Sequence, residues 1–242
     1  MHLTEIARTD RPPQLTFMRD YVAAQQPIVI RGEMDDWEAI GRWSPADLRA
    51  RCADRTVPVT RGPSQLHAAL DRMIDAIEGP VDAIVPELAH EVRVPQFVPR
   101  SPLSTEIDHP TLWIGGAHTS SLRFEPGTEQ LVQAVYGTTT VRLFPMSEAM
   151  NLYRRSTLDP AFATSPVDAW QPDAAAHPRA SQATGFVATL AAGEMLYVPP
   201  MWWRSVGTSK PSIRLTTSWR SLTKPPLFSR TGLATRVLPR LR

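Results

Sequence analysis

The chain has 242 residues, of which 42% are hydrophobic, and its 26 Lys and Arg residues nearly balance its 24 Asp and Glu residues. A chain of this length can bury one sizeable core, so we expect a single domain, and the formal net charge of +2 gives no indication of nucleic-acid binding. The single cysteine, Cys52, excludes an intrachain disulfide and a cysteine-rich zinc site. Without a signal-peptide pattern or a run of roughly 18 apolar residues, the sequence predicts a cytoplasmic protein that does not contact a membrane.

The first 80 residues are expected to contribute helices and edge strands to the outside of the domain. Ser44 precedes Pro45, and Asp47 follows two residues later, a pattern typical of the start of a helix. Apolar residues between Leu66 and Ile77 recur at spacings of three and four, which predicts an amphipathic helix that begins near Ser64. The β-branched segments 27–32 and 56–59 predict two short strands.

Further along the chain, short β-branched or aromatic segments bounded by turn residues predict the main sheets. They are residues 111–114, 130–136, 139–144, 185–190, 195–199 and 213–219. Because no long helix separates them, they are typical of an antiparallel sandwich or barrel. Residues 161–184, rich in Pro and Ala, predict a long loop or lid over one end. We expect the core to span residues 110–220 and residues 221–242 to form a solvated basic tail.

Several of these segments, in this order, are similar to the core strands of the cupin-like JmjC family. That family belongs to the Fe(II)/2-oxoglutarate-dependent hydroxylases and includes the asparaginyl hydroxylases. The similar segments are residues 26–32, 36–37, 43–44, 112–115, 133–137, 141–145 and 193–203. The resemblance implies a mainly β fold with accessory helices, built around a double-stranded β-helix of the cupin or jelly-roll kind.

The resemblance also identifies where the family binds its metal. Catalytic members hold Fe(II) with a His-x-Asp pair on one strand and a second His on a distant strand, and residues i and i+2 of a strand face the same way. The aligned residues here are Arg123, Glu125 and Arg204. Arginine stays protonated and has no lone pair to donate to a metal. The sequence therefore predicts a substituted metal site and no cofactor, with Fe(II) and 2-oxoglutarate as the alternative.

A second set of residues is expected to line the ligand cavity. Thr139 stands where the resemblance places the lysine that pairs with 2-oxoglutarate, and Arg214 with Thr216 resembles the Arg-x-Ser/Thr carboxylate clamp of other 2-oxoglutarate oxygenases. His118 is expected in a turn before Arg123 rather than on a metal. The remaining candidates are two strand tryptophans, Trp113 and Trp203, whose ordinary role is packing.

These substitutions leave three functions open. In the first, Arg123, Glu125 and Arg204 act on an anionic small molecule or peptide in the reused cavity, by binding or by non-oxidative catalysis. The second is an active hydroxylase with non-standard ligands, and the third is a non-catalytic pseudoenzyme that binds a partner protein. Whether the chain is an enzyme stays undecided, although a cofactor-independent enzyme is favoured over an oxygenase. We also expect the protein to be a monomer or a weak homodimer. Within the barrel, Glu125 is expected to bridge Arg123 and Arg204 directly or through water.

Overall fold

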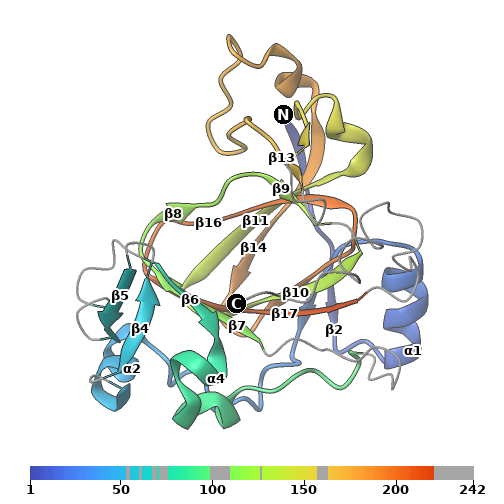
Figure 1. The fold of residues 1–242 in the computed structure, drawn as a ribbon. Coiled ribbons are helices and arrows are strands. Elements are labelled where there is room, and N and C mark those ends of the chain that lie inside the picture. Colours follow the sequence, from blue (N-terminus) through green and yellow to red (C-terminus); the bar gives the residue numbers. More distant parts are fainter. Residues whose placement is uncertain are drawn as a thin grey trace, which may run out of the picture.

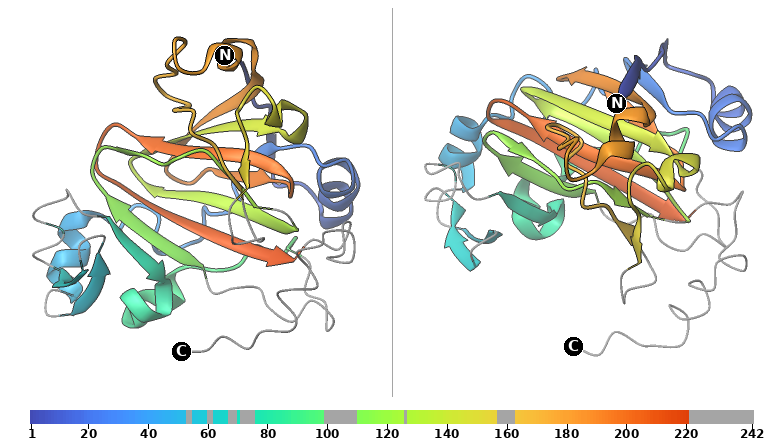
Figure 2. Two further views of the ribbon diagram at one scale, coloured as in Figure 1. Left: turned by 45° about the horizontal axis from the view of Figure 1, so that its top comes forward. Right: turned by 90° about the horizontal axis from the view of Figure 1, so that it is seen from above.

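The computed structural model describes residues 1–52, 55–59, 62–66, 70, 76–98, 110–125, 127–156 and 163–220. Their strands form two sheets that lie face to face (Figures 1 and 2). In spatial order, the first sheet contains β1 (His2–Glu5), β14 (Thr184–Ala191), β11 (Thr138–Pro145), β16 (Trp202–Thr208), β9 (Arg123–Phe124), β13 (Ala163–Thr164) and β12 (Arg155–Ser156), with β8 (His118–Thr119) also paired to β16. The second contains β2 (Arg8–Asp10), β3 (Ile28–Arg31), β15 (Met195–Val198), β10 (Thr128–Tyr136), β17 (Ser212–Arg220), β7 (Thr111–Gly115), β6 (Ile77–Pro80), β4 (Thr56–Val59) and β5 (Gly62–Gln65).

The central strands pair antiparallel, as their alternating sequence pattern predicts. In the second sheet, β10 lies between β15 and β17, and in the first sheet β11 lies between β14 and β16. Short helices surround the sheets: α1 (Gln14–Phe17), η1 (Met18–Ala23), α2 (Pro45–Cys52), α4 (Val81–Ile84), η2 (Pro86–Glu91), η3 (Met146–Ala149) and η4 (Pro178–Gln182). The prediction of a mainly β jelly roll with accessory helices is confirmed.

Three apolar clusters show which way the strand residues face. One cluster lies between the sheets and contains Val132 and Val198 of the second sheet and Val141 and Val206 of the first. A larger cluster joins the outer face of the second sheet to the helices near the N-terminus. The third covers the outer face of the first sheet around Trp203. Since successive side chains of a strand point to opposite faces, these clusters assign an inner or an outer face to each polar strand residue.

One predicted helix of the N-terminal region is confirmed, and the extent of another is corrected. Helix α2 begins at Pro45, and the Ser44 Oγ accepts a hydrogen bond of 3.1 Å from the Asp47 backbone N–H. Within the amphipathic helix expected from Ser64 to Ile77, Leu66 and Leu70 are helical, but Ser64 lies in β5 and Ile77 begins β6, so the helix is shorter than expected. Ile77 is β-branched and pairs with β7 across the sheet, so local spacing misassigned it. Residues 67–69 and 71–75, within that expected helix, lie outside the described residues.

The expected long loop after residue 161 packs against the first sheet. Among its described residues it contains β13 and η4 and is otherwise irregular. The Trp170 indole N–H donates a 2.7 Å hydrogen bond to the Ser205 Oγ on the outer face of β16. The guanidinium of Arg142 lies 4.4 Å from the centre of the Trp170 ring and donates to the Ala169 carbonyl. Trp170 therefore fastens this segment to the outer face of the first sheet.

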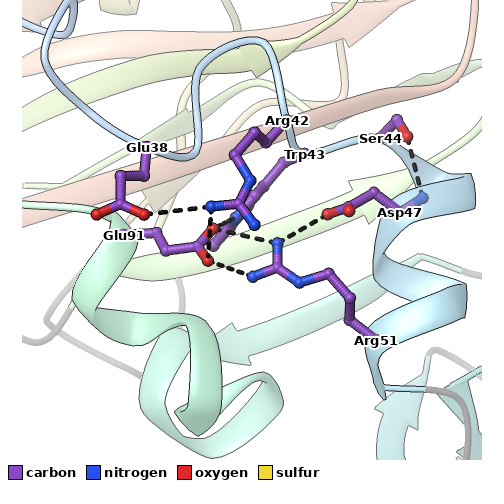
Figure 3. A network of polar contacts seen from close by, with 7 residues as sticks. All are labelled: Glu38, Arg42, Trp43, Ser44, Asp47, Arg51 and Glu91. Atoms are coloured by element: carbon purple, nitrogen blue, oxygen red, sulfur yellow. Dashed lines mark hydrogen bonds and ion pairs between the residues drawn. The ribbon is translucent and has the colours of Figure 1, made fainter.

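A buried carboxylate joins the helices that cover the second sheet (Figure 3). Glu91, at the end of η2, is 3% exposed and accepts a 2.7 Å hydrogen bond from the Trp43 indole N–H. Arg51 of α2 donates to both carboxylate oxygens of Glu91, and the Arg42 Nη1 lies 3.7 Å from the Glu91 Oε1. Because Arg51 also contacts Asp47 at 3.0 Å, the network links α2, the loop before it and η2.

Two further predictions concern membrane contact and the C-terminal tail. No helix within the described ranges is both long enough and apolar enough to cross a membrane. Residues 221–242, which were expected to form a basic tail, lie outside the described residues.

Candidate functional site

The two arginines that the resemblance placed at metal-ligand positions lie opposite each other. Arg123 of β9 and Arg204 of β16 are register partners across an antiparallel strand pair. On β16, Trp203 belongs to the outer cluster and Val206 to the cluster between the sheets, so Arg204 faces inward. Phe124 belongs to the outer cluster as well, which places Arg123 on the inner side of β9.

Glu125 is paired with only one of these arginines. Its Oε1 lies 3.5 Å from the Arg204 Nη2, and its Oε2 accepts a 2.6 Å hydrogen bond from the Gln130 Nε2. The Arg204 side chain is 13% exposed and that of Glu125 is 32% exposed, whereas Arg123 is open to solvent. Within the part of the chain that the structure describes, the expected bridge from Glu125 is therefore formed to Arg204 and not to Arg123.

These three residues belong to a groove at one end of the space between the sheets. The described residues that line it are Arg123, Glu125, Thr128, Gln130, Val198, Pro199, Trp202 and Arg204. The lining combines two guanidinium groups and one carboxylate with an apolar wall. The side-chain oxygens that could coordinate a metal belong to the Glu125 carboxylate, the Gln130 amide and the Thr128 hydroxyl. The described residues of the lining include no imidazole.

The charge on Arg204 is only partly compensated. Burial lowers the pKa of its guanidinium, and the nearby positive charge of Arg123 lowers it further. The negative charge of Glu125 opposes both effects. Two like charges and one opposite charge thus meet at the groove, which leaves a positive local field.

Arg214 lies deeper, on the inner face of β17. Its neighbours Ile213 and Leu215 point into the outer cluster of the second sheet, so Arg214 points between the sheets, where it is 8% exposed. Its guanidinium carbon lies 3.6 Å from the centre of the Trp113 ring. Burial, and secondly the positive charge of Arg204, lower the pKa of Arg214 to about 9.

Among the described residues, three buried polar atoms in this inner region have no hydrogen-bond partner. They are the Arg214 Nη1, the Thr139 Oγ1 and the Ser212 Oγ. The sequence predicted ligand contact for Arg214 and Thr139 but missed Ser212. Because Ser212 precedes Arg214 by two residues on one strand, the alternation of side chains was the signal that indicated a shared face.

Two of the expected cavity residues lie elsewhere. Trp203 is fully buried in the outer cluster beside Phe124, with ring centres 5.3 Å apart, so it does not line the groove. Its neighbour Trp202 does, because odd and even positions of β16 face opposite ways. His118 lies in the short strand β8 rather than in a turn, exposed and 5.9 Å from the Trp113 ring. Partial burial of its imidazole, and secondly the positive charge of Arg214, lower the pKa of His118.

A separate cluster brings potential metal ligands together outside the groove. One ligand atom from each of Glu38, His90 and Glu91 lies within 4.8 Å of the others. Arg42 binds the Glu38 carboxylate at 3.2 Å, and Arg51 occupies both oxygens of Glu91. A cation at this cluster would therefore compete with two arginines for the same oxygens.

The amino-acid sequence is similar to a known domain family and to several known proteins. The sequence model of a family described as "Cupin-like domain" matches residues 71–224. The chain is 24% identical over 216 residues to lysine-specific demethylase 8 of Xenopus tropicalis, covering 80% of this chain and 48% of that protein. It is 28% identical over 228 residues to lysine-specific demethylase JMJ30 of Arabidopsis thaliana, covering 84% of this chain and 52% of that protein.

A human protein of more similar length also matches. The bifunctional peptidase and (3S)-lysyl hydroxylase JMJD7 of Homo sapiens is 27% identical over 251 residues, covering 83% of this chain and 79% of that protein. The two demethylases are roughly twice as long as the aligned region, so this chain spans about half the length of those relatives.

Proposed function

Since this chain belongs to the cupin-like JmjC domain family, within the 2-oxoglutarate oxygenase superfamily, we propose that it reuses the groove between its sheets to bind an anionic group of a small molecule or peptide, without iron. The observation that carries the proposal is the register pair of Arg123 and Arg204, with Glu125 held on Arg204. Guanidinium groups bind carboxylates and phosphates in bidentate fashion, and the field at this groove is positive.

The residues at the groove do not fit the iron site that the family implies. Such a site needs neutral imidazole nitrogens and a carboxylate that converge on open coordination positions. Arg123 and Arg204 offer protonated nitrogens at the positions where the imidazoles are expected. The remaining donors of the described lining are one carboxylate, which Gln130 and Arg204 already engage, and two neutral oxygens.

Each groove residue has a distinct role in the proposed binding. Arg204 is anchored by Glu125 and provides the fixed donor, while the exposed Arg123 can close on the ligand from the opposite strand. Trp202 and Pro199 provide an apolar wall for the carbon skeleton. For a ligand that reacts, Glu125 can accept a proton, and Arg204 can stabilise negative charge that develops nearby.

The alternative of an active hydroxylase draws on the relatives, one of which is named a (3S)-lysyl hydroxylase. We expect the purified protein, loaded anaerobically with Fe(II), to retain no stoichiometric iron by elemental analysis and to form no succinate from 2-oxoglutarate. The reason is that two guanidinium groups repel a divalent cation at this groove. Stoichiometric iron together with succinate formation would establish the hydroxylase and overturn the proposal.

Two substitutions that each remove a charge from the groove are expected to change its affinity for anions in opposite directions. With inorganic phosphate and glutarate as probes, Arg204→Gln is expected to weaken binding by about tenfold or more, since hydrogen bonds to charged groups contribute about 1.5 to 3 kcal/mol. Glu125→Gln is expected to strengthen binding a few-fold, because it removes the carboxylate that competes for Arg204.

Isothermal titration calorimetry measures both affinities, and Arg220→Gln at the exposed end of β17 is the control for a general loss of positive charge. Equal effects of Arg204→Gln and Arg220→Gln would show that the probes respond only to net charge. If neither probe binds the parent protein, the groove is not an anion site, and the pseudoenzyme alternative takes precedence.

A further inference from the structure

The short strand that carries Arg123 is held from both sides. β9 contains only two residues, and Arg123 is paired with Arg204 of β16 on one side and with Thr164 of β13 on the other (Figure 1). The Arg123 side chain is exposed, so contacts with neighbouring side chains do little to fix it. The place of the Arg123 guanidinium relative to Arg204 therefore depends mainly on the backbone of β9 and on the segment that follows β13.

Ser165 extends the contact between β13 and the chain that leads into β9. Its backbone N–H donates a 3.1 Å hydrogen bond to the Leu122 carbonyl. Its Oγ donates to the Leu152 carbonyl and accepts a 3.0 Å hydrogen bond from the Val167 N–H. Ser165 is buried, so water does not compete freely for these hydrogen bonds. This segment thus holds the edge of β9 that faces away from β16.

Trp170 fixes the far end of this segment on the outer face of β16. A Cβ at Gly207 would lie 2.6 Å from the Trp170 Cζ2, so the ring occupies space that the glycine leaves open. The indole N–H donates to the Ser205 Oγ at 2.7 Å. The Asp168 Oδ1 accepts a 2.7 Å hydrogen bond from the Trp170 backbone N–H. The ring and the backbone of Trp170 are therefore both held in place.

The same indole is connected to the chain that precedes Arg123. The Ser205 Oγ, which accepts from Trp170, donates a 2.7 Å hydrogen bond to the Ser120 carbonyl. The Val206 N–H donates to the Ser120 Oγ at 2.9 Å, and the Ser120 N–H donates to the Val206 carbonyl at 2.8 Å. Trp170 therefore joins the two attachments between which β9 lies.

We propose that Trp170 is a positioning residue of the groove, which holds Arg123 opposite Arg204 so that both guanidinium groups reach one anionic ligand. This inference rests on the proposed function and adds to it a residue outside the described groove lining. Trp170 contacts the outer face of β16, whereas Arg204 points to the inner face, so its influence on a ligand must pass through the backbone of β9. Without Trp170, a ligand has to order β9 as it binds. We therefore expect the contribution of Arg123 to be lost and that of Arg204 to remain.

A double-mutant cycle with inorganic phosphate as the probe tests the inference. Arg123→Gln is expected to weaken phosphate binding about tenfold, and Trp170→Leu about fivefold, since hydrogen bonds to a charged group are lost or misplaced. In the Arg123→Gln background, Trp170→Leu is expected to cause at most about a 1.5-fold further loss, because substitutions that act through one group are not additive. Isothermal titration calorimetry measures the four affinities. Equal losses in both backgrounds would mean that Trp170 does not act through Arg123, which overturns the proposal.

A second variant and a matched control test whether the place of the Trp170 ring is what matters. Gly207→Ala keeps the indole but puts a methyl group where its ring lies, so it is expected to reproduce both the loss and the coupling to Arg123. Trp43→Phe removes another 2.7 Å indole hydrogen bond, to Glu91 among the helices that cover the second sheet, and is expected to leave phosphate affinity unchanged. An equal loss in Trp43→Phe would show a general effect of lower stability and contradict the positioning role.

Hydrogen exchange tests the attachment without any ligand. In Trp170→Leu, the Ser165 amide is expected to exchange about tenfold faster, because local opening of the segment frees it from the Leu122 carbonyl. The Ala134 amide, in the middle of β10, is expected to keep its parent rate. Nuclear magnetic resonance resolves the two amides. Unchanged exchange at Ser165 would overturn the positioning role, whatever the affinities.

The outcomes for Trp170 and for the groove are distinguishable. If phosphate binds the parent protein and depends on Arg204, but the effect of Trp170→Leu is the same with and without Arg123, the positioning role is wrong and the proposed function stands. If phosphate does not bind the parent protein, both are wrong.

Discussion

Glu91→Ala is expected to lower the free energy of unfolding by about 3 to 5 kcal/mol, because it removes the buried acceptor of a charged network. The substitution leaves the Trp43 indole N–H without its 2.7 Å partner and removes the carboxylate that both Arg51 and Arg42 contact. It also leaves a cavity beneath α2, where the carboxylate joins that helix to η2.

Urea unfolding followed by circular dichroism measures this effect. Glu38→Ala is the matched control, since Glu38 pairs with Arg42 at 3.2 Å on the exposed side of the same network. Exposed ion pairs contribute about 1 kcal/mol or less, so the control should remain close to the parent protein. A loss at Glu91 no larger than the loss at Glu38 would show that the buried carboxylate is not what joins these helices.

The combined variant Arg123→His, Glu125→Asp and Arg204→His is expected to gain affinity for Fe(II) or Co(II) by about two orders of magnitude or more, which corresponds to about 2.8 kcal/mol. The prediction follows from the register pair of positions 123 and 204, which brings two imidazoles to one side of the carboxylate. Two nitrogen donors and one oxygen donor suit a first-row divalent metal.

The Glu38, His90 and Glu91 cluster requires a control in this experiment, because it also presents ligand atoms. His90→Ala in both the parent and the combined variant removes one donor from that cluster without touching the groove. Calorimetry with Co(II), supported by its absorption spectrum, then reports the groove alone. If the combined variant binds Co(II) no better than the parent, positions 123, 125 and 204 do not form the family's metal site in this chain.

Most of the fold follows from local sequence patterns. Strands β3, β10, β11, β14 and β17 match their predicted segments within two residues, since β-branched residues and turn residues act locally. The start of α2 is equally local, because the Ser44 side chain caps its own helix. Local patterns did not predict the strand that carries Arg204, which only the resemblance placed on a strand, and they placed Ile77 in a helix, because both strands are defined by long-range pairing.

The candidate site likewise combines features that the sequence indicates with features that only the packing of the sheets determines. The resemblance implied, without any structure, that Arg123, Glu125 and Arg204 align with the family's metal ligands, and strand periodicity predicted only that residues two apart share a face. Which arginine Glu125 contacts, the outward orientation of Trp203 and the burial of Arg214 depend on residues far apart in the chain. Burial and charge compensation are properties of the packed sheets, so only the tertiary structure decided that Arg214 lies buried between them, with no hydrogen-bond partner for its Nη1 among the described residues.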